Sequence, residues 1–182
     1  MEISSIISIA IALSFDSFAV ATTSGFLIKK IKISQALKIA VFFAVFQGVF
    51  PFFGWLIGEG IQKLFADYYY LAAAIFITIG IKLVYQGFKR NPIKTPINPI
   101  NTIVLIGLSV ATSVDALIVG IGFSFVNFEI FFSMAVIAIV TFIFSIAGVY
   151  IGNKTQKLIK MRFDIIGGVI LIIFGLRILF FN

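Results

Sequence analysis

Two aspartates lie near the middle of long apolar runs, where acidic side chains are rare. Asp16 stands in the phrase SFDS at residues 14–17, and Asp115 stands in the similar phrase SVDA at residues 113–116. A carboxylate at the centre of a bilayer costs about 2.5 to 3.5 kcal/mol on insertion scales, so two in equivalent settings indicate a function. Two ionised carboxylates together would neutralise one divalent cation. The sequence therefore predicts a cation site.

Polar side chains close to the aspartates, and in two other apolar runs, could complete an oxygen-rich site. The candidate metal ligands are Asp16, Asp115, Gln47, Ser14, Ser17, Thr112, Ser113 and Thr141. Their hydroxyls do not all share one helical face with the neighbouring aspartate. Carboxylate, amide and hydroxyl oxygens suit hard cations such as Mg, Ca or Mn. Like charges held close repel each other, so we expect proton uptake to accompany ion release.

The helical neighbours of both aspartates are mostly small. Ala12 and Ala19 flank Asp16, and Ala111 and Gly122 flank Asp115, at helical spacing. Small side chains permit close helix approach. We therefore expect both carboxylates to point into a helix bundle, with the two aspartate-bearing runs in contact.

The composition predicts that these runs lie in a membrane. Of 182 residues, 61% are hydrophobic and 12% are charged, against about 25% charged residues in an ordinary soluble domain. The length allows about six spans of about 20 residues each and leaves no room for a soluble catalytic or nucleotide-binding domain. The chain has no cysteine and no histidine. Thiolate and imidazole metal sites are therefore excluded, and any metal must be held by oxygen.

Six apolar runs are long enough to cross a bilayer as helices, which satisfy their own backbone hydrogen bonds in lipid. The predicted spans are Ile3–Ile28, Ile39–Ile57, Tyr69–Phe88, Ile103–Val126, Ile130–Ile151 and Phe163–Phe181. The predicted fold is an all-α membrane protein with six transmembrane helices.

The basic residues alternate between loops. Eleven of the 14 lysines and arginines follow the first, third and fifth runs: Lys29, Lys30, Lys32, Lys38, Lys89, Arg90, Lys94, Lys154, Lys157, Lys160 and Arg162. The positive-inside rule places these loops in the cytoplasm. We therefore predict a multi-pass protein of the cell membrane with both termini outside. The charges form no continuous patch, so a net charge of +7 does not indicate a nucleic-acid partner.

The two halves of the chain repeat each other. GWLIG at residues 54–58 recurs as GVYIG at 148–152, and GIKL at 80–83 recurs as GLRI at 175–178. The offsets of these motifs are 94 and 95 residues, and that of the aspartates is 99. In this alignment Gln47 corresponds to Thr141.

The repeats predict one membrane domain over residues 1–182, with a first three-helix repeat at 1–90, a linker at 91–101 and a second repeat at 102–182. Three spans per copy would invert the second copy relative to the first. Inverted repeats are typical of secondary transporters, in which the substrate site lies near the midplane between the halves.

Two basic residues occupy matching positions towards span ends. Lys82 and Arg177 align in the repeats. One interpretation is that their long side chains extend to the membrane interface. The other is that they gate the site or pair with an aspartate.

Four segments together resemble a known family. They are ALSFDSFAV at residues 12–20, FQGVFPFFGW at 46–55, ATSVDALIVG at 111–120 and DIIGG at 164–168. From end to end the chain resembles the MntP family of manganese efflux pumps, within the wider group of LysE-like exporters. The resemblance implies a six-helix inner-membrane exporter with Mn(II) as transported substrate, no resident cofactor, and Asp16 and Asp115 as central functional carboxylates. Some relatives have glutamate where this chain has Gln47, and alanine is usual at the position of Ile118.

Energetics favours a coupled transporter rather than an enzyme. Moving a divalent cation outward against an inside-negative potential costs about 4.6 kcal/mol per 100 mV. The chain has no phosphate-binding loop of the GxxxxGK[ST] type that would indicate ATP use. We therefore expect protons to enter through the aspartates while the two halves alternate access around a bound metal ion.

Two other functions remain open at this stage. LysE-like relatives also include amino-acid exporters. An intramembrane aspartyl protease would also need two aspartates on different helices, but its Gly-x-Gly-Asp motif is absent around Asp115. The expected partners are the lipid bilayer, a divalent metal ion and protons, and assembly into a homo-oligomer is left open.

Overall fold

The computed structural model is built from helices throughout the part of the chain that it describes. It describes residues 3–28, 30–62, 68–89, 98–126 and 129–155, together with 169, 171–173, 175–176 and 179. The helices are α1 (Ile3–Leu27), α2 (Ile33–Gln62), α3 (Tyr68–Lys89), α4 (Thr102–Phe125) and α5 (Ile130–Thr155). No strand occurs in these ranges. The predicted all-α class is confirmed.

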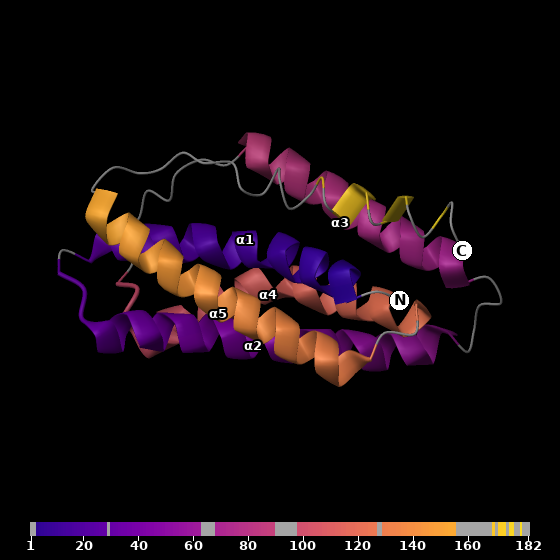
Figure 1. The fold of residues 1–182 in the computed structure, drawn as a ribbon, viewed down its shortest axis with the longest axis horizontal. Helices are drawn as coiled ribbons and strands as arrows, with labels where there is room; N and C mark the ends of the chain where they lie inside the picture. The colour runs from indigo at the N-terminus through magenta and orange to yellow at the C-terminus, as the bar shows by residue number, and fades with distance from the viewer. Residues whose placement is uncertain are drawn as a thin grey trace.

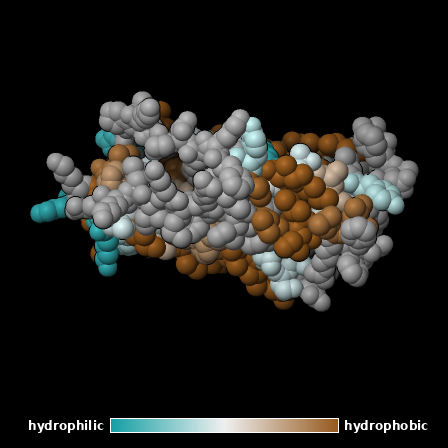
Figure 2. Space-filling model, turned by 90° about the horizontal axis from the view of Figure 1, so that it is seen from above, coloured by the Kyte–Doolittle hydropathy of each residue, from teal (hydrophilic) through white to brown (hydrophobic). Residues whose placement is uncertain are grey.

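The surface of the helices is suited to lipid. α1, α2, α4 and α5 are each long and apolar enough to cross a membrane. Large apolar side chains point outward on them, among them Ile33, Ile103 and Phe131, which are 70%, 79% and 74% exposed. Figure 2 shows a brown, hydrophobic area across part of one face and teal, hydrophilic residues at one end. Apolar surface of this extent belongs in contact with lipid rather than water.

The bounds of three helices lie within one residue of the predicted spans, but α2 and α5 are longer. α2 begins six residues before the predicted Ile39 and continues five beyond Ile57. At its start the Lys32 carbonyl accepts the Gln35 and Ala36 N–H groups. Hydropathy marks only the apolar part of a span, whereas the helix continues through polar turns. Most of the predicted sixth span, Phe163–Phe181, lies outside the described residues.

Four helices form a central body, and α3 lies on one side of it (Figure 1). α1 packs mainly on α5, α2 packs on both α4 and α5, and α3 packs chiefly on α4. α1 and α4 also touch, over a smaller area. Near the C-terminus, Gly175 lies against Ala73 and Ile77 of α3. The two aspartate-bearing helices therefore meet, as expected, but each has its largest interface with another helix.

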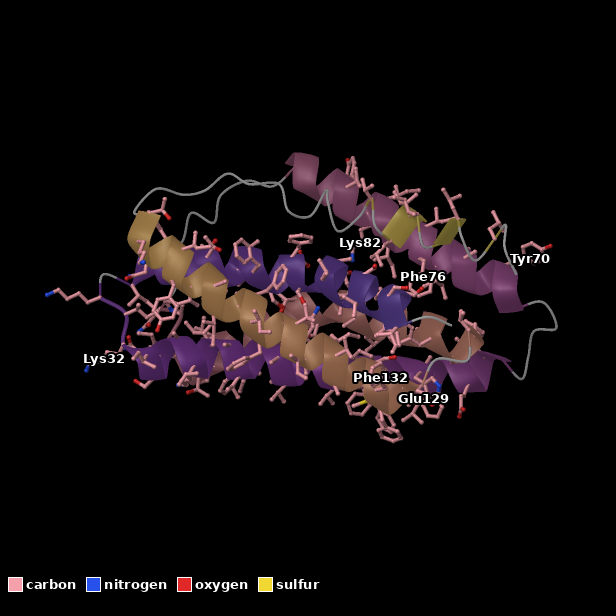
Figure 3. The ribbon with its side chains drawn as sticks, in the orientation of Figure 1. Lys32, Tyr70, Phe76, Lys82, Glu129 and Phe132 are labelled. Atoms are coloured by element: carbon pink, nitrogen blue, oxygen red, sulfur yellow. The ribbon has the colours of Figure 1, made fainter. Side chains whose placement is uncertain are left out.

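Lysines lie at one end of the body. Figure 3 shows Lys32 at the end where α1 passes into α2, and Tyr70 and Glu129 towards the opposite end. The Lys38 ammonium donates to the Ile100 carbonyl at 3.1 Å and to the Thr102 hydroxyl at 2.9 Å. These bonds place the start of α4 at the lysine-rich end.

Glycines let the central helices approach through their backbones. A Cβ added to Gly54 of α2 would collide with the Leu117 carbonyl oxygen of α4, and one added to Gly148 of α5 would lie 2.7 Å from the Phe18 carbonyl oxygen of α1. Only glycine fits at such contacts. These contacts bring α2 close to α4, and α1 close to α5, around a set of buried polar groups.

Candidate functional site

Asp115 lies in the middle of α4 and forms an ion pair with α3. The N-terminus of α4 is capped by Asn101, whose side chain accepts the Ile103 N–H at 2.9 Å. Asp115 is only 7% exposed, and the Lys82 ammonium donates to its Oδ1 at 2.8 Å. Of the two interpretations of Lys82, pairing with an aspartate is confirmed.

Two contacts hold α3 on this face of α4. The rings of Phe76 and Phe123 lie 6.4 Å apart between centroids. Figure 3 shows Lys82 and Phe76 extending from α3 towards the central body. Lys82 lies seven residues before the end of α3, about 10 Å along the helix axis. A lysine at this depth can extend to the membrane interface or to an aspartate, so the sequence alone left its role open.

The ion pair offsets the cost of a buried carboxylate. Removing one partner of such a pair leaves an uncompensated charge, which is strongly unfavourable away from water. The Lys82 side chain is 43% exposed and the Asp115 side chain 9% exposed. The carboxylate is therefore the more buried partner and the lysine the more accessible one.

Asp16 lies in the middle of α1 and is partly buried. It shares a helical stripe with Ile9 and Leu13. Both of these apolar side chains belong to the same core cluster as Ala116 and Val119 of α4, which flank Asp115. The aspartate-bearing stripes of α1 and α4 therefore line one core. Arg177, the counterpart of Lys82 in the repeat alignment, lies outside the described residues.

A buried polar layer joins the four central helices. Ser14, Gln47, Ser113 and Thr141 are all 0% exposed. The hydroxyls of Ser14 and Thr141 lie 3.1 Å apart, and the Ser113 hydroxyl donates to Gln47 Oε1 at 3.2 Å. The Gln47 amide nitrogen also donates to the Leu13 carbonyl at 3.2 Å. The structure thus brings four of the predicted ligands into one hydrogen-bonded layer.

Asp115 and Ser113 face different neighbours. Residues two apart on a helix point about 200° apart. Ser113 accordingly contacts Gln47 of α2, whereas Asp115 contacts Lys82 of α3. The Asp115 carboxylate and the polar layer are therefore separate groups in this conformation.

The remaining predicted hydroxyls differ in availability. Thr112 bonds within its own helix, to the carbonyls of Leu108 and Ser109, both at 3.1 Å. Ser17 is 0% exposed, and in the described part of the chain its Oγ has no hydrogen-bond partner. The same is true of Ser109 and Ser145. A buried hydroxyl without a partner is costly, so Ser17 and Ser145 can gain from a ligand.

Sequence reasoning missed Ser109 and the Leu13 carbonyl. Ser109 could have been found because it stands three residues before Thr112, on the same stripe of an apolar helix. The carbonyl leaves no sequence signal. Over the described residues, no three acidic side chains gather as a metal-binding group. A cation here would use the aspartates together with neutral oxygens.

Comparison with known proteins gives consistent matches along the chain. Residues 30–179 match the model of the Mntp family, described as "Putative manganese efflux pump". A protein of Crocosphaera subtropica with the same description is 38% identical over 180 residues, covering 98% of this chain and 96% of its own. One from Rippkaea orientalis is 39% identical, covering 94% and 92%, and one from Aliarcobacter butzleri is 37% identical, covering 97% and 98%. No solved structure matches.

Proposed function

The chain belongs to the Mntp family of manganese efflux pumps, and from this premise we propose that it exports Mn(II) across the cytoplasmic membrane through a site centred on Asp16 and Asp115. The observation that carries the proposal is the placement of both carboxylates in the middle of apolar helices that line one core. Charged side chains at that depth are expensive and mark ion pathways.

The proposed architecture is two inverted repeats of three spans, at residues 1–90 and 102–182, joined by a linker at 91–101. The polar layer supports it. Ser14 and Ser113 differ by 99 residues, the offset of the aspartates, and Gln47 and Thr141 differ by 94. In this architecture the Ser14–Thr141 and Ser113–Gln47 hydrogen bonds are equivalent contacts between the two copies.

Backbone packing supports the same repeat. Gly54 lies against the Leu117 carbonyl, and Gly148 lies against the Phe18 carbonyl. Gly148 follows Gly54 by 94 residues, and Leu117 follows Phe18 by 99. Each copy thus contributes one glycine, against which a backbone carbonyl of the other copy packs. Equivalent contacts on both sides are what an inverted repeat requires.

We propose that the metal is bound by Asp16 and Asp115 with help from the surrounding oxygens. Gln47 supplies an amide oxygen, which a hydrogen bond from the Ser113 hydroxyl holds in place. The hydroxyls of Ser14, Ser17, Thr112 and Thr141 complete the set as the helices move. Oxygen ligands of this kind suit Mn(II) and other hard cations.

Transport would proceed by alternating access, with the two repeats rocking around the aspartates. Export works against the membrane potential, at about 4.6 kcal/mol per 100 mV for a divalent ion. Protons entering through the same carboxylates would supply the driving force. The lysine-rich end faces the cytoplasm by the positive-inside rule, so both termini lie outside.

Manganese tolerance of cells that depend on this exporter tests the proposal. Asp16→Asn and Asp115→Asn should each abolish tolerance while the protein remains in the membrane, because neither neutral amide can balance a divalent charge. Glu129→Gln is the matched control, since Glu129 lies outside the central body and should leave tolerance unchanged. Full tolerance in both aspartate variants would remove the basis for the site. Altered resistance to amino-acid analogues, without a manganese effect, would favour an amino-acid exporter.

A further inference from the structure

The Lys82 ammonium is paired with Asp115, the carboxylate that binds the metal in the proposed function. We propose that Lys82 is a tethered counter-ion that the transported cation must displace, so that ammonium and metal occupy Asp115 in turn. The inference rests on the proposed function, because it describes how the same site empties and fills.

The geometry makes the two occupants exclusive at the bonded oxygen. Lys82 Nζ lies 2.8 Å from Asp115 Oδ1, at full hydrogen-bond contact. A divalent metal needs that oxygen at about 2.0 to 2.6 Å. An ammonium and a divalent ion held so close would also repel each other strongly in a low-dielectric site. Repulsion between the two cations therefore favours departure of the lysine when a metal binds Asp115.

The burial of the two partners shows which one can move. The Asp115 side chain is 9% exposed, whereas the Lys82 side chain is 43% exposed. A lysine stem has four rotatable bonds and makes a flexible tether. The Phe76–Phe123 contact is a second link between α3 and α4 that does not involve the ion pair. The lysine side chain is therefore the part of the pair that can move.

The exchange has a consequence for each half of the transport cycle. When the carrier is empty, Lys82 balances Asp115 and Asp16 carries the returning proton, so the helices can change conformation without exposing a bare carboxylate to the membrane interior. When metal arrives, the same lysine competes with it. Lys82 should thus weaken metal binding and speed the return of the empty carrier.

Removal of the positive charge tests both effects in the purified full-length protein. Lys82→Gln should bind Mn(II) more tightly, with a dissociation constant lower by about fivefold, as expected for loss of a part-exposed charge pair. Binding can be followed by electron paramagnetic resonance of free Mn(II). In sealed vesicles the variant should lose most net Mn(II) transport, which requires empty return. It should retain Mn(II)–Mn(II) exchange, which does not.

Two other lysine variants control for charge and position. Lys82→Arg keeps a positive charge and should retain net transport. Lys38→Gln removes a lysine that bonds to Ile100 and Thr102 at the end of the body, and should change neither affinity nor the ratio of net transport to exchange. If Lys82→Gln bound Mn(II) no more tightly, or lost net transport and exchange alike, Lys82 would be structural and the inference would be overturned.

Thermal stability keeps the test decisive if Lys82→Gln folds poorly. Mn(II) should then raise its melting temperature more than that of the wild type, because the metal replaces the missing ammonium. A melting temperature indifferent to Mn(II) would overturn the inference. Failure of the proposed function looks different, since the wild-type protein itself would neither bind nor move Mn(II).

Discussion

Individual residues divide the central region into a charged group and a neutral one. Asp115 is paired with Lys82 on the α3 side of α4, while Gln47 links Ser113 and the Leu13 carbonyl on the α2 side. The sequence predicted these residue types and their depth. It could not predict which lysine rotamer forms or which carbonyl is reached, since both depend on how helices distant in sequence pack.

Gln47 offers a direct test of the polar layer. Gln47→Ala should lower the free energy of unfolding by about 1 to 3 kcal/mol, because the buried Ser113 hydroxyl loses its acceptor. Thermal melting of the detergent-solubilised protein measures the change. Ser8→Ala is the control, since that hydroxyl is exposed and bonds only to Ser4 of its own helix. Equal melting of Gln47→Ala and wild type would show that the layer does not contribute to stability.

At the scale of elements, glycines let the α2/α4 and α1/α5 pairs approach through their backbones. Predicted spans reproduced α1, α3 and α4 closely because their apolar runs end at polar turns. They shortened α2, because its first turns carry Gln35 and Lys38 and its apolar core begins later. Pro51 lies inside α2 without ending it. Neither hydropathy nor the repeat predicted the main partner of each helix; only contact between the two aspartate-bearing helices was expected, from their small neighbouring residues.

The α2/α4 contact predicts an asymmetric effect of two glycine changes. Gly54→Val should destabilise the protein by about 1 to 3 kcal/mol or more, because its methyl groups would collide with the Leu117 carbonyl in a tightly packed interface. Gly60→Ala, in the same helix with nothing within 4 Å of an added Cβ, should cause no loss. Melting temperatures compare the two. Equal melting temperatures for Gly54→Val and wild type would show that the close contact with the Leu117 carbonyl does not restrict the side chain at this position.

The whole molecule has two chemically different ends. Lys32 and Lys38 lie at one end, and Glu129 lies towards the other. The sequence predicted this separation from the alternation of loop charge. The side of the membrane that each end occupies follows only from the positive-inside rule.

Topology reporters test the orientation. A reporter inserted in the α1–α2 loop near Lys30 should read cytoplasmic, and one inserted at Glu129 should read external, because the lysine-rich loops are retained inside. Both inserts lie between helices, so neither interrupts a span. The reverse pattern would contradict the proposed orientation, in which the lysine-rich end faces the cytoplasm.

Metal transport by the purified chain in sealed vesicles tests the central claim most directly. With a proton gradient imposed, the wild-type protein should move Mn(II) against its concentration gradient, and the Asp115→Asn variant should not. Dissipating the gradient should stop net movement, because protons are the proposed driving ions. Mg, Ca and Cd measured alongside define the selectivity of the oxygen site. Equal Mn(II) movement in wild type, Asp115→Asn and protein-free vesicles would contradict the account.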